Sequence, residues 1–256
     1  MTSDRRDEIE RQFGRAAELY ARSEHRDGED LERLRAWARP RSTEVLLDVA
    51  TGAGHTALHF APHVRHVVVT DLADGMLARA REMFARSGVS NAEFRSADVQ
   101  ALPFAAERFD YVTCRIAAHH FLDLVGALAE ITRVLRPGGA FLLVDSTAPE
   151  DADAARFLDE VERLRDATHV CSHSRAAWLS MCGAAGLRVE HQDVIRKRRA
   201  FEFWLDRGGC DDVVRAELRA RFAGASDKLR SIFEIEIDAG EVKAFSDDKI
   251  VLAARK

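Results

Sequence analysis

The chain has 256 residues, enough for one large α/β domain with an insertion, and it can bury a core without disulfides or a metal. Hydrophobic residues make up 46% and charged residues 32%, while 5 prolines, 15 glycines and 4 cysteines exclude collagen-like and disulfide-rich classes. The formal net charge of −5 argues against a dedicated nucleic-acid-binding protein.

The first forty residues predict a helical cap. Gly28 interrupts the helical pattern, Asp30 can cap a second helix, and Pro40 ends that helix because proline cannot continue the hydrogen-bond ladder. We expect residues 1–40 to cover a larger core that spans 41–195. The apolar residues with the three- and four-residue spacing of one helix face are Ile9, Phe13, Ala16, Ala17 and Tyr20.

Strands and helices alternate from residue 41 onward. The runs 45–49 and 67–69 have the length and β-branched content of buried parallel strands, with a helix, 55–62, between them. This is a βαβ unit, whose crossover is right-handed. The pattern predicts an α/β protein with a mostly parallel sheet. Further helices are expected at 76–87 and 124–135, and further strands at 92–95, 109–114, 140–145 and 187–195.

The stretch 196–246 breaks the alternation. It opens with the basic run 196–199, which is better explained as a solvated strand end than as a phosphate-binding patch. Two helices are predicted at 213–222 and 226–233. We interpret 196–246 as an insertion that covers the substrate site before the last strand, 247–256, within one domain, 1–256.

We expect neither a membrane span nor a secretory signal. No stretch of 18 apolar residues is present, and residues 1–10 are rich in Asp, Glu and Arg, where a signal peptide would be apolar. The sequence is therefore interpreted as that of a cytoplasmic, bacterial-type protein. Free thiols are expected at the four widely spaced cysteines, Cys114, Cys171, Cys182 and Cys210.

A glycine-rich turn follows the first predicted strand. Residues 48–54 read DVATGAG, and glycines in such a turn let a ligand approach the backbone closely. Asp71 closes the next strand and can accept hydrogen bonds from ribose hydroxyls, while Asp98 can accept from an exocyclic adenine amine. Each feature has a structural alternative: a tight turn without a ligand, or an aspartate that caps a turn. The glycines alone also fit a dinucleotide fingerprint.

Four stretches together carry a resemblance to a known family. The sequence is similar to the class I S-adenosylmethionine-dependent methyltransferases, in their UbiE/YcgJ-like branch. This resemblance implies a Rossmann-like, doubly wound, seven-stranded and mostly parallel sheet whose last strand is antiparallel. The stretches are LLDVATGAGHTALHFAP, VVVTDLADGMLARARE, FRSADVQALPFAAERFDYVTCRIAAHHF and EITRVLRPGGAFLLVD.

The resemblance also assigns cofactor-binding roles. The turn would hold the methionine part, Asp71 the ribose, and two apolar side chains the adenine. A front segment would close over the cofactor. The residues are Asp48, Ala50, Thr51, Gly52 and Gly54 at the turn; Asp71, Leu72 and Met76; Ala97, Asp98 and Val99 at the adenine edge; Arg115 and Ala117; and Tyr20, His25 and Gly28 in the front segment.

The implied function is methyl transfer from S-adenosylmethionine to a small-molecule acceptor, with carbon, oxygen and nitrogen all open as the acceptor atom. The resemblance favours quinone-like or secondary-metabolite acceptors. Two alternatives remain: a protein that binds S-adenosylmethionine without methyl transfer, as a sensor or rearrangement catalyst, and an NAD(P)-dependent dehydrogenase. The position of Asp48 four residues before Gly52 weakens the dehydrogenase interpretation. We expect no nucleic-acid partner, and we keep a homodimer open.

His119 and His120 follow the fourth predicted strand at the edge where the methyl group would lie. A histidine near pH 6.5 is a suitable general base, although either ring can instead be structural. His169, Cys171 and His173 have the spacing of metal ligands, but a closed zinc site needs a fourth ligand, so we expect packing or substrate contact and no metal.

An aromatic cluster lies at the start of the insertion, at Phe201, Phe203 and Trp204. It can cover an apolar acceptor or simply pack the insertion onto the sheet. The substrate-contact candidates are therefore His169, His173, Phe201 and Trp204.

Overall fold

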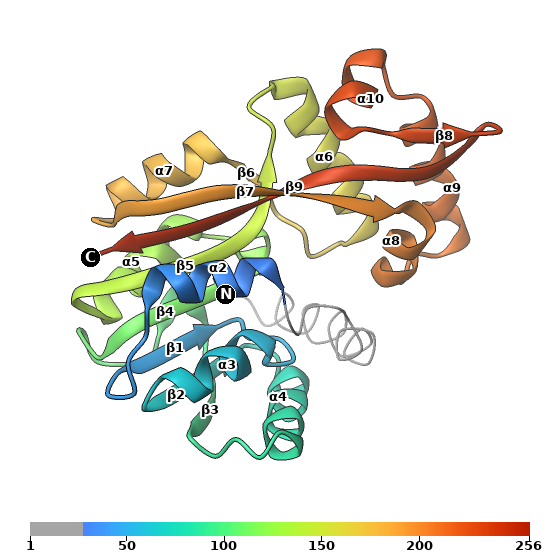
Figure 1. The fold of residues 1–256 in the computed structure, drawn as a ribbon. Coiled ribbons are helices and arrows are strands. Elements are labelled where there is room, and N and C mark those ends of the chain that lie inside the picture. The colour runs from blue at the N-terminus through green and yellow to red at the C-terminus, as the bar shows by residue number, and fades with distance from the viewer. Residues whose placement is uncertain (1–27) are drawn as a thin grey trace.

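A central β-sheet organises residues 28–256, which the computed structural model describes (Figure 1). Its strand order is β3-β2-β1-β4-β5-β9-β7, and the first five are parallel, while β9 runs antiparallel to both of its neighbours. The predicted Rossmann-like, mostly parallel sheet with an antiparallel last strand is confirmed. The strands are β1 (Val45–Val49), β2 (His66–Asp71), β3 (Ala92–Ser96), β4 (Phe109–Arg115), β5 (Leu135–Ala148), β7 (Arg188–Ala200) and β9 (Glu241–Arg255).

Two short strands extend the sheet beyond the seven that were expected. β6 (His173–Ser174) pairs with the end of β5, and β8 (Glu236–Asp238) pairs with the start of β9. Both lie beside the long antiparallel strands, away from the β1–β4 core.

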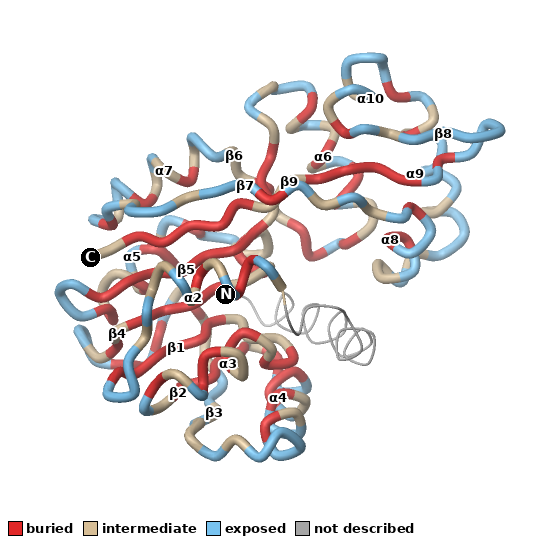
Figure 2. The backbone as a smooth tube through the Cα atoms, viewed as in Figure 1, coloured by how far each residue is buried: buried red, intermediate tan, exposed pale blue. Residues whose placement is uncertain are grey.

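Helices cover both faces of the sheet, because side chains alternate between the faces along each strand. The apolar cluster on one face packs under α5 and α7, and the cluster on the other face packs under α2, α3 and α4. In Figure 2 the centre of the sheet is buried and the outer helix surfaces are exposed. The helices are α2 (Glu29–Ala38), α3 (His55–Phe60), α4 (Asp74–Arg86), α5 (Leu124–Val134) and α7 (Arg175–Ala184).

The strands that flank the insertion are longer than the sequence pattern indicated. β7 continues to Ala200 and β9 begins at Glu241, so the inserted segment is 201–240 rather than 196–246. The basic run stays in the strand because its arginines pair with carboxylates of neighbouring strands. The pairs are Arg199–Asp247 at 2.8 Å, Arg198–Glu236 at 2.7 Å and Arg196–Asp248 at 3.2 Å.

The insertion has an apolar core of its own. Its helices pack with α6 (Ala152–Arg165) over the far ends of β7 and β9, at the upper right of Figure 1. The predicted helices at 213–222 and 226–233 correspond to α9 (Asp212–Ala223) and α10 (Asp227–Phe233), and α8 (Phe201–Gly208) precedes them. The buried cluster consists of Val161, Phe201, Trp204, Leu205, Leu218, Phe222, Val242 and Phe245.

Within residues 28–256, no helix is long and apolar enough to cross a membrane. All four cysteines of the chain are free thiols.

Phe222 is the centre of the insertion core, and its ring lies 4.8–5.7 Å from those of Phe157, Phe201, Trp204 and Phe245. We expect Phe222→Ala to lower the free energy of unfolding by about 3–5 kcal/mol, because it leaves a cavity among large side chains. Urea denaturation measures the change. The control is Val213→Ala at a 79% exposed site, with a change within about 0.5 kcal/mol. A similarly small loss for Phe222→Ala would contradict this assignment of the core.

Candidate functional site

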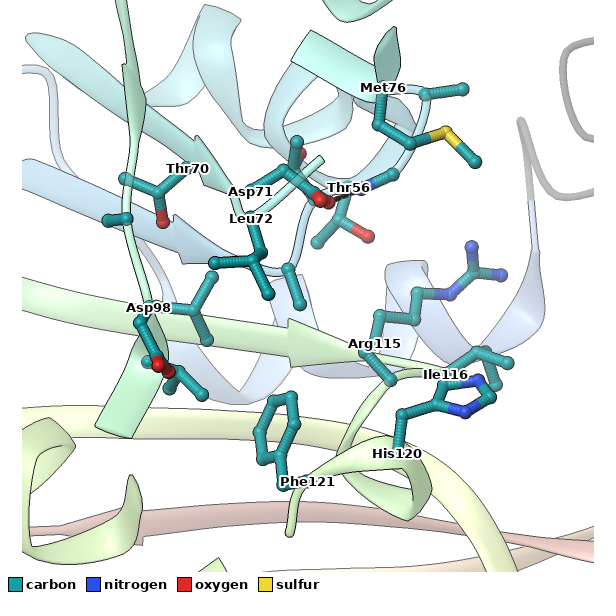
Figure 3. A pocket seen from close by; sticks show the side chains of 18 of the residues that line it. Thr56, Thr70, Asp71, Leu72, Met76, Asp98, Arg115, Ile116, His120 and Phe121 are labelled. Carbon is teal, nitrogen blue, oxygen red and sulfur yellow. Dashed lines mark hydrogen bonds between the residues drawn. The ribbon is translucent and has the colours of Figure 1, made fainter. Parts of the chain in front are cut away.

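A pocket of about 160 Å³ lies at the carboxyl ends of the parallel strands, where open α/β sheets bind ligands (Figure 3). We call it the glycine-turn pocket. It brings together residues that are up to 73 positions apart in the sequence, from Val49 to Leu122, at the ends of β1, β2, β3 and β4. The predicted residues that line it are Ala50, Thr51, Gly52, Asp71, Leu72, Met76, Ala97, Asp98, Val99, Arg115 and Ala117, together with His120.

The turn itself depends on left-handed backbone. Gly52 and Gly54 have φ values of +56° and +91°. A Cβ atom on Gly52 would meet nothing within 4 Å, whereas one on Gly54 would lie 3.0 Å from the Cβ of Ala80. Gly52 therefore gives the turn its shape at the pocket wall, and Gly54 instead permits close packing against α4. Gly54 does not line the pocket.

Asp48 lies beneath the turn and not in the pocket, which differs from its expected role as a ligand contact. It is 1% exposed and accepts hydrogen bonds from the hydroxyl of Thr113, at 2.5 Å, and from that of Thr51. Burial raises its pKa to about 6, although the two hydroxyls act in the opposite direction. Asp48 thus supports the turn from within the sheet.

Asp71 ties the turn to β2. Its Oδ2 accepts a hydrogen bond from the Gly52 N–H at 2.8 Å, and its Oδ1 accepts one from the Ala73 N–H at 2.9 Å. Burial raises the pKa of the carboxyl against the effect of these N–H groups. Each oxygen keeps capacity to accept from a ligand hydroxyl.

Asp98 lines the glycine-turn pocket just after β3. Its Oδ1 accepts from the backbone N–H of Gln100 at 2.9 Å and from the Gln100 side chain at 3.2 Å, so Oδ2 keeps its acceptor capacity. Between Asp71 and Asp98 the pocket wall is mostly apolar, which suits a flat aromatic ring.

The pocket residues that the sequence did not single out are Val49, Ala53, His55, Thr56, Thr70, Gln100, Ile116, Phe121 and Leu122. The signal that could have identified these residues is their position next to the motifs in the sequence.

A second pocket, of about 520 Å³, lies between the strand ends, α2, α6 and the insertion. We call it the insertion-side pocket. The two pockets share Arg115 and Ile116. The Arg115 Nε donates to Asp30 Oδ2 at 2.7 Å, and both side chains are about nine-tenths buried, so α2 is fastened to the end of β4. Gly28, expected to contact the cofactor, lines this second pocket instead.

His119 and Asp145 form a buried pair at the insertion-side pocket. The ring Nδ1 lies 2.5 Å from Asp145 Oδ1, and the backbone N–H of His119 donates to Oδ2 at 2.9 Å. Burial opposes ionisation of Asp145, but attraction to His119, this hydrogen bond and Lys249 outweigh it, so its pKa lies below the usual value. A carboxylate at Nδ1 keeps the proton there and leaves Nε2 as an acceptor.

His120 lies in the other pocket and has different partners. Its Nδ1 lies 3.1 Å from both the carbonyl oxygen and the hydroxyl oxygen of Thr168. Burial, and then His119, lower the pKa of His120 well below its usual value despite Asp166. Its ring is therefore neutral near pH 7. Figure 3 shows it beside Ile116 and below Arg115.

The substrate-contact candidates separate in the structure. His169 and Trp204 line the insertion-side pocket, and His169 Nε2 pairs with Asp159 at 3.0 Å. Phe201 is fully buried in the insertion core and His173 lies in β6, so neither lines a pocket described here. Phe203, which is 58% exposed, lines the insertion-side pocket instead.

In the described range, no three His, Cys, Asp or Glu side chains are grouped so that they could hold a metal ion. The segment 169–173 is mostly a loop that turns along α6 and β5, so its three candidate ligands do not share one strand face. Tyr20 and His25 lie outside the described residues.

The raised pKa of Asp48 predicts how stability depends on pH. A carboxyl whose pKa rises on folding stabilises the fold below its ordinary pKa, near 4, and this contribution is lost as the pH rises through about 6. Asp48→Asn removes the titration. Between pH 4 and pH 7 we expect the stability of the variant relative to the native protein to increase by about 2 kcal/mol, measured by urea denaturation. A pH-independent difference would contradict this origin.

Comparisons with known proteins show the family to which this chain belongs. A model described as "Methyltransferase domain" matches residues 47–143. A Bacillus subtilis protein named "Uncharacterized methyltransferase YcgJ" is 36% identical over 88% of this chain and 90% of its own length. The structure of the BH2331 protein from Bacillus halodurans superimposes with a TM-score of 0.87 at 38% identity, over 90% of this chain and 99% of that chain.

A shorter match is to the ubiquinone/menaquinone biosynthesis C-methyltransferase UbiE of a Marinomonas species, at 33% identity over 47% of this chain and 49% of that protein. The match to YcgJ extends over nearly all of both proteins, and the family model lies on the strands that form the glycine-turn pocket. The chain belongs to the S-adenosylmethionine-dependent methyltransferases of class I, in their UbiE/YcgJ-like branch.

Proposed function

We propose that the protein transfers a methyl group from S-adenosylmethionine, held in the glycine-turn pocket, to a small molecule held in the insertion-side pocket. The observation that carries this proposal is that the two pockets meet at Arg115 and Ile116, with the His119–Asp145 pair beside that junction. A methyl donor and an acceptor need adjoining sites so that the displacement can occur in line.

The residues of the glycine-turn pocket fit the cofactor. Gly52 has open space where a Cβ would stand, so a ligand can lie against the backbone. Asp71 has capacity for the two ribose hydroxyls, and Asp98 can accept from the adenine amine. Leu72, Val99 and the adjacent apolar side chains would enclose the ring.

Bound S-adenosylmethionine supplies a methyl group already activated by its sulfonium. The chain's own residues then align the acceptor, exclude water and remove a proton where the nucleophile carries one. His119 is the group placed for proton removal, because Asp145 fixes its tautomer with Nε2 as the acceptor. His120 is neutral, held by Thr168 and turned to the other pocket, so we assign it a positioning role.

The acceptor atom follows from this arrangement only in part. A histidine base serves a hydroxyl, an ammonium group or an acidic carbon. No nucleic-acid partner is proposed, since the arginines of the run 196–199 pair with carboxylates. A cytoplasmic location and a homodimer stay predictions.

Asp71→Asn tests the cofactor site. We expect S-adenosylhomocysteine to bind about 10- to 100-fold more weakly, because a charged acceptor of two hydroxyls is lost. Calorimetric titration measures the affinity, and NADPH is expected not to bind. The matched control is Asp74→Asn, an exposed position in the first turn of α4 that does not line the pocket. Unchanged affinity in a folded Asp71→Asn variant, or tight NADPH binding, would refute the assignment.

Turnover tests the transfer itself. The native protein should release S-adenosylhomocysteine from S-adenosylmethionine with at least one member of a panel of hydroxyl, amine and acidic-carbon acceptors. His119→Gln should lower kcat about 100- to 10,000-fold and leave cofactor affinity within about twofold, because only proton removal is lost. Asp145→Asn should show a similar loss through the wrong tautomer.

The control for these variants is His66→Gln, at the start of β2 and away from both pockets. If His119→Gln keeps more than half of the activity, His119 is not the base. If no acceptor gives turnover while the cofactor binds, a binding protein without transfer is the better description.

A further inference from the structure

Along β5, β7 and β9, the side chains on one face of the sheet change from apolar to polar and then to apolar again. Next to α2 it is apolar, with Val144, Ile195 and Val251 in the core beneath that helix. Further along β9, Phe245 belongs to the insertion core. Between these two apolar regions, the same face carries a band of polar residues, which are Ser146, Lys197, Arg199, Asp247 and Lys249.

All five residues of the band line the insertion-side pocket, although the side chains of Lys249 and Asp247 are only 12% and 7% exposed. A charged row in the middle of a sheet is costly to bury and adds nothing to the apolar cores on either side. Its place is better explained by a ligand than by folding.

The charges of this pocket do not cancel. Seven basic and four acidic side chains line it. The acidic side chains are largely engaged: Asp247 receives two hydrogen bonds from Arg199, at 2.8 and 3.2 Å, and Glu162 receives two from Arg165, at 3.0 and 2.7 Å. Asp30 is held by Arg115.

Two lysines supply the excess positive charge. Lys249 is buried, with Nζ 2.6 Å from the hydroxyl of Ser146 and 3.9 Å from the already paired Asp247. Burial lowers the pKa of Lys249 and Arg199 acts in the same direction, whereas Asp247, Asp145 and Glu162 act in the opposite direction. Lys197 stands directly across from Asp247 on β7, half-buried, and has no ion pair within residues 28–256.

Two aromatic side chains of α8 also line the pocket. Phe203 is 58% exposed on α8 and lines the cavity, and Trp204 beside it stacks under the guanidinium of Arg165 at 5.1 Å. A cavity of about 520 Å³ with cations on one side and rings on another fits a molecule with an acidic end and an apolar body.

We propose that the methyl acceptor is an anion, a carboxylate or a phosphate ester on an apolar ring or chain, whose acidic group binds Lys197 and Lys249 and whose apolar part contacts Phe203 and Trp204. This inference rests on the proposed function, because it takes the insertion-side pocket as the acceptor site. It differs from the neutral, quinone-like acceptor that the sequence resemblance favours.

Matched probes of one shape test the charge requirement. The probes are 2-naphthoate, 2-naphthyl phosphate and the neutral 2-naphthalenemethanol, with the protein saturated with S-adenosylhomocysteine. We expect at least one anion to bind 10-fold or more tightly than the alcohol, measured by ligand-observed NMR. The stronger of the two anions identifies the acidic group as carboxylate or phosphate. Equal binding of the alcohol, or no binding of either anion, overturns the proposal.

Two lysine variants test whether Lys249 and Lys197 bind the acidic group of the acceptor. Lys249→Met and Lys197→Met should each reduce the preference for the anion to about threefold or less and leave the alcohol unchanged. Asp247 keeps its bonds to Arg199 in both variants, so the fold should be retained. The control is Lys243→Met, on the same strand but 45% exposed and paired with Glu241 outside the pocket. Full anion preference in both pocket variants overturns the assignment.

Binding of S-adenosylhomocysteine is measured first in every variant and separates the two levels of inference. Retained cofactor binding without any anion preference overturns the anionic acceptor and leaves the proposed function standing. If S-adenosylhomocysteine does not bind to the native protein, both the anionic acceptor and the proposed function are overturned.

Discussion

Two buried carboxylates hold the turn on which the pocket depends. Asp48 fastens the end of β1 to β4 through the hydroxyl of Thr113, and Asp71 fastens the turn to β2 through the N–H of Gly52. The left-handed backbone at Gly52 and Gly54 is costly for most residues and needs such support. Because β1 pairs with both β2 and β4, these bonds fix three strand ends with respect to one another.

The second constraint is the junction of the two pockets. Ile116 has a positive φ of 54°, which is unusual for a β-branched residue, and it follows directly on the end of β4. The chain then turns so that His120 faces one pocket and His119 the other, although the two residues are adjacent. Asp145, at the end of the neighbouring strand, holds His119 through both its ring and its backbone.

The insertion gives the protein a second, smaller core and part of the wall of the insertion-side pocket. The aromatic side chains of α8 have different surroundings: Phe201 packs in the insertion core, Trp204 packs there and also lines the pocket, and Phe203 lines the pocket and is exposed. The long antiparallel strands β7 and β9 connect the two cores (Figure 1). The band of polar residues lies on the part of the sheet face between these cores.

The sequence by itself determined the α/β class, the glycine turn and most of the glycine-turn pocket, because those residues lie at strand ends and the apolar runs of β1, β2 and β4 are plain, although that of β3 is weak. It also identified the histidine pair without distinguishing its members, since the partner of His119 is 26 positions away and that of His120 is 48.

Only the tertiary structure decided which histidine has a carboxylate, and that Asp48 and Phe201 are buried supports. It also decided which carboxylates pair with the arginines of the strand-end run 196–199. These outcomes depend on pairing of β1 with β4 for Asp48, on pairing of β5, β7 and β9 for the arginines, and on partners that are far apart in the chain, such as Arg199 and Asp247. Local spacing carries no information about such partners, whereas strand ends are marked by the residues themselves.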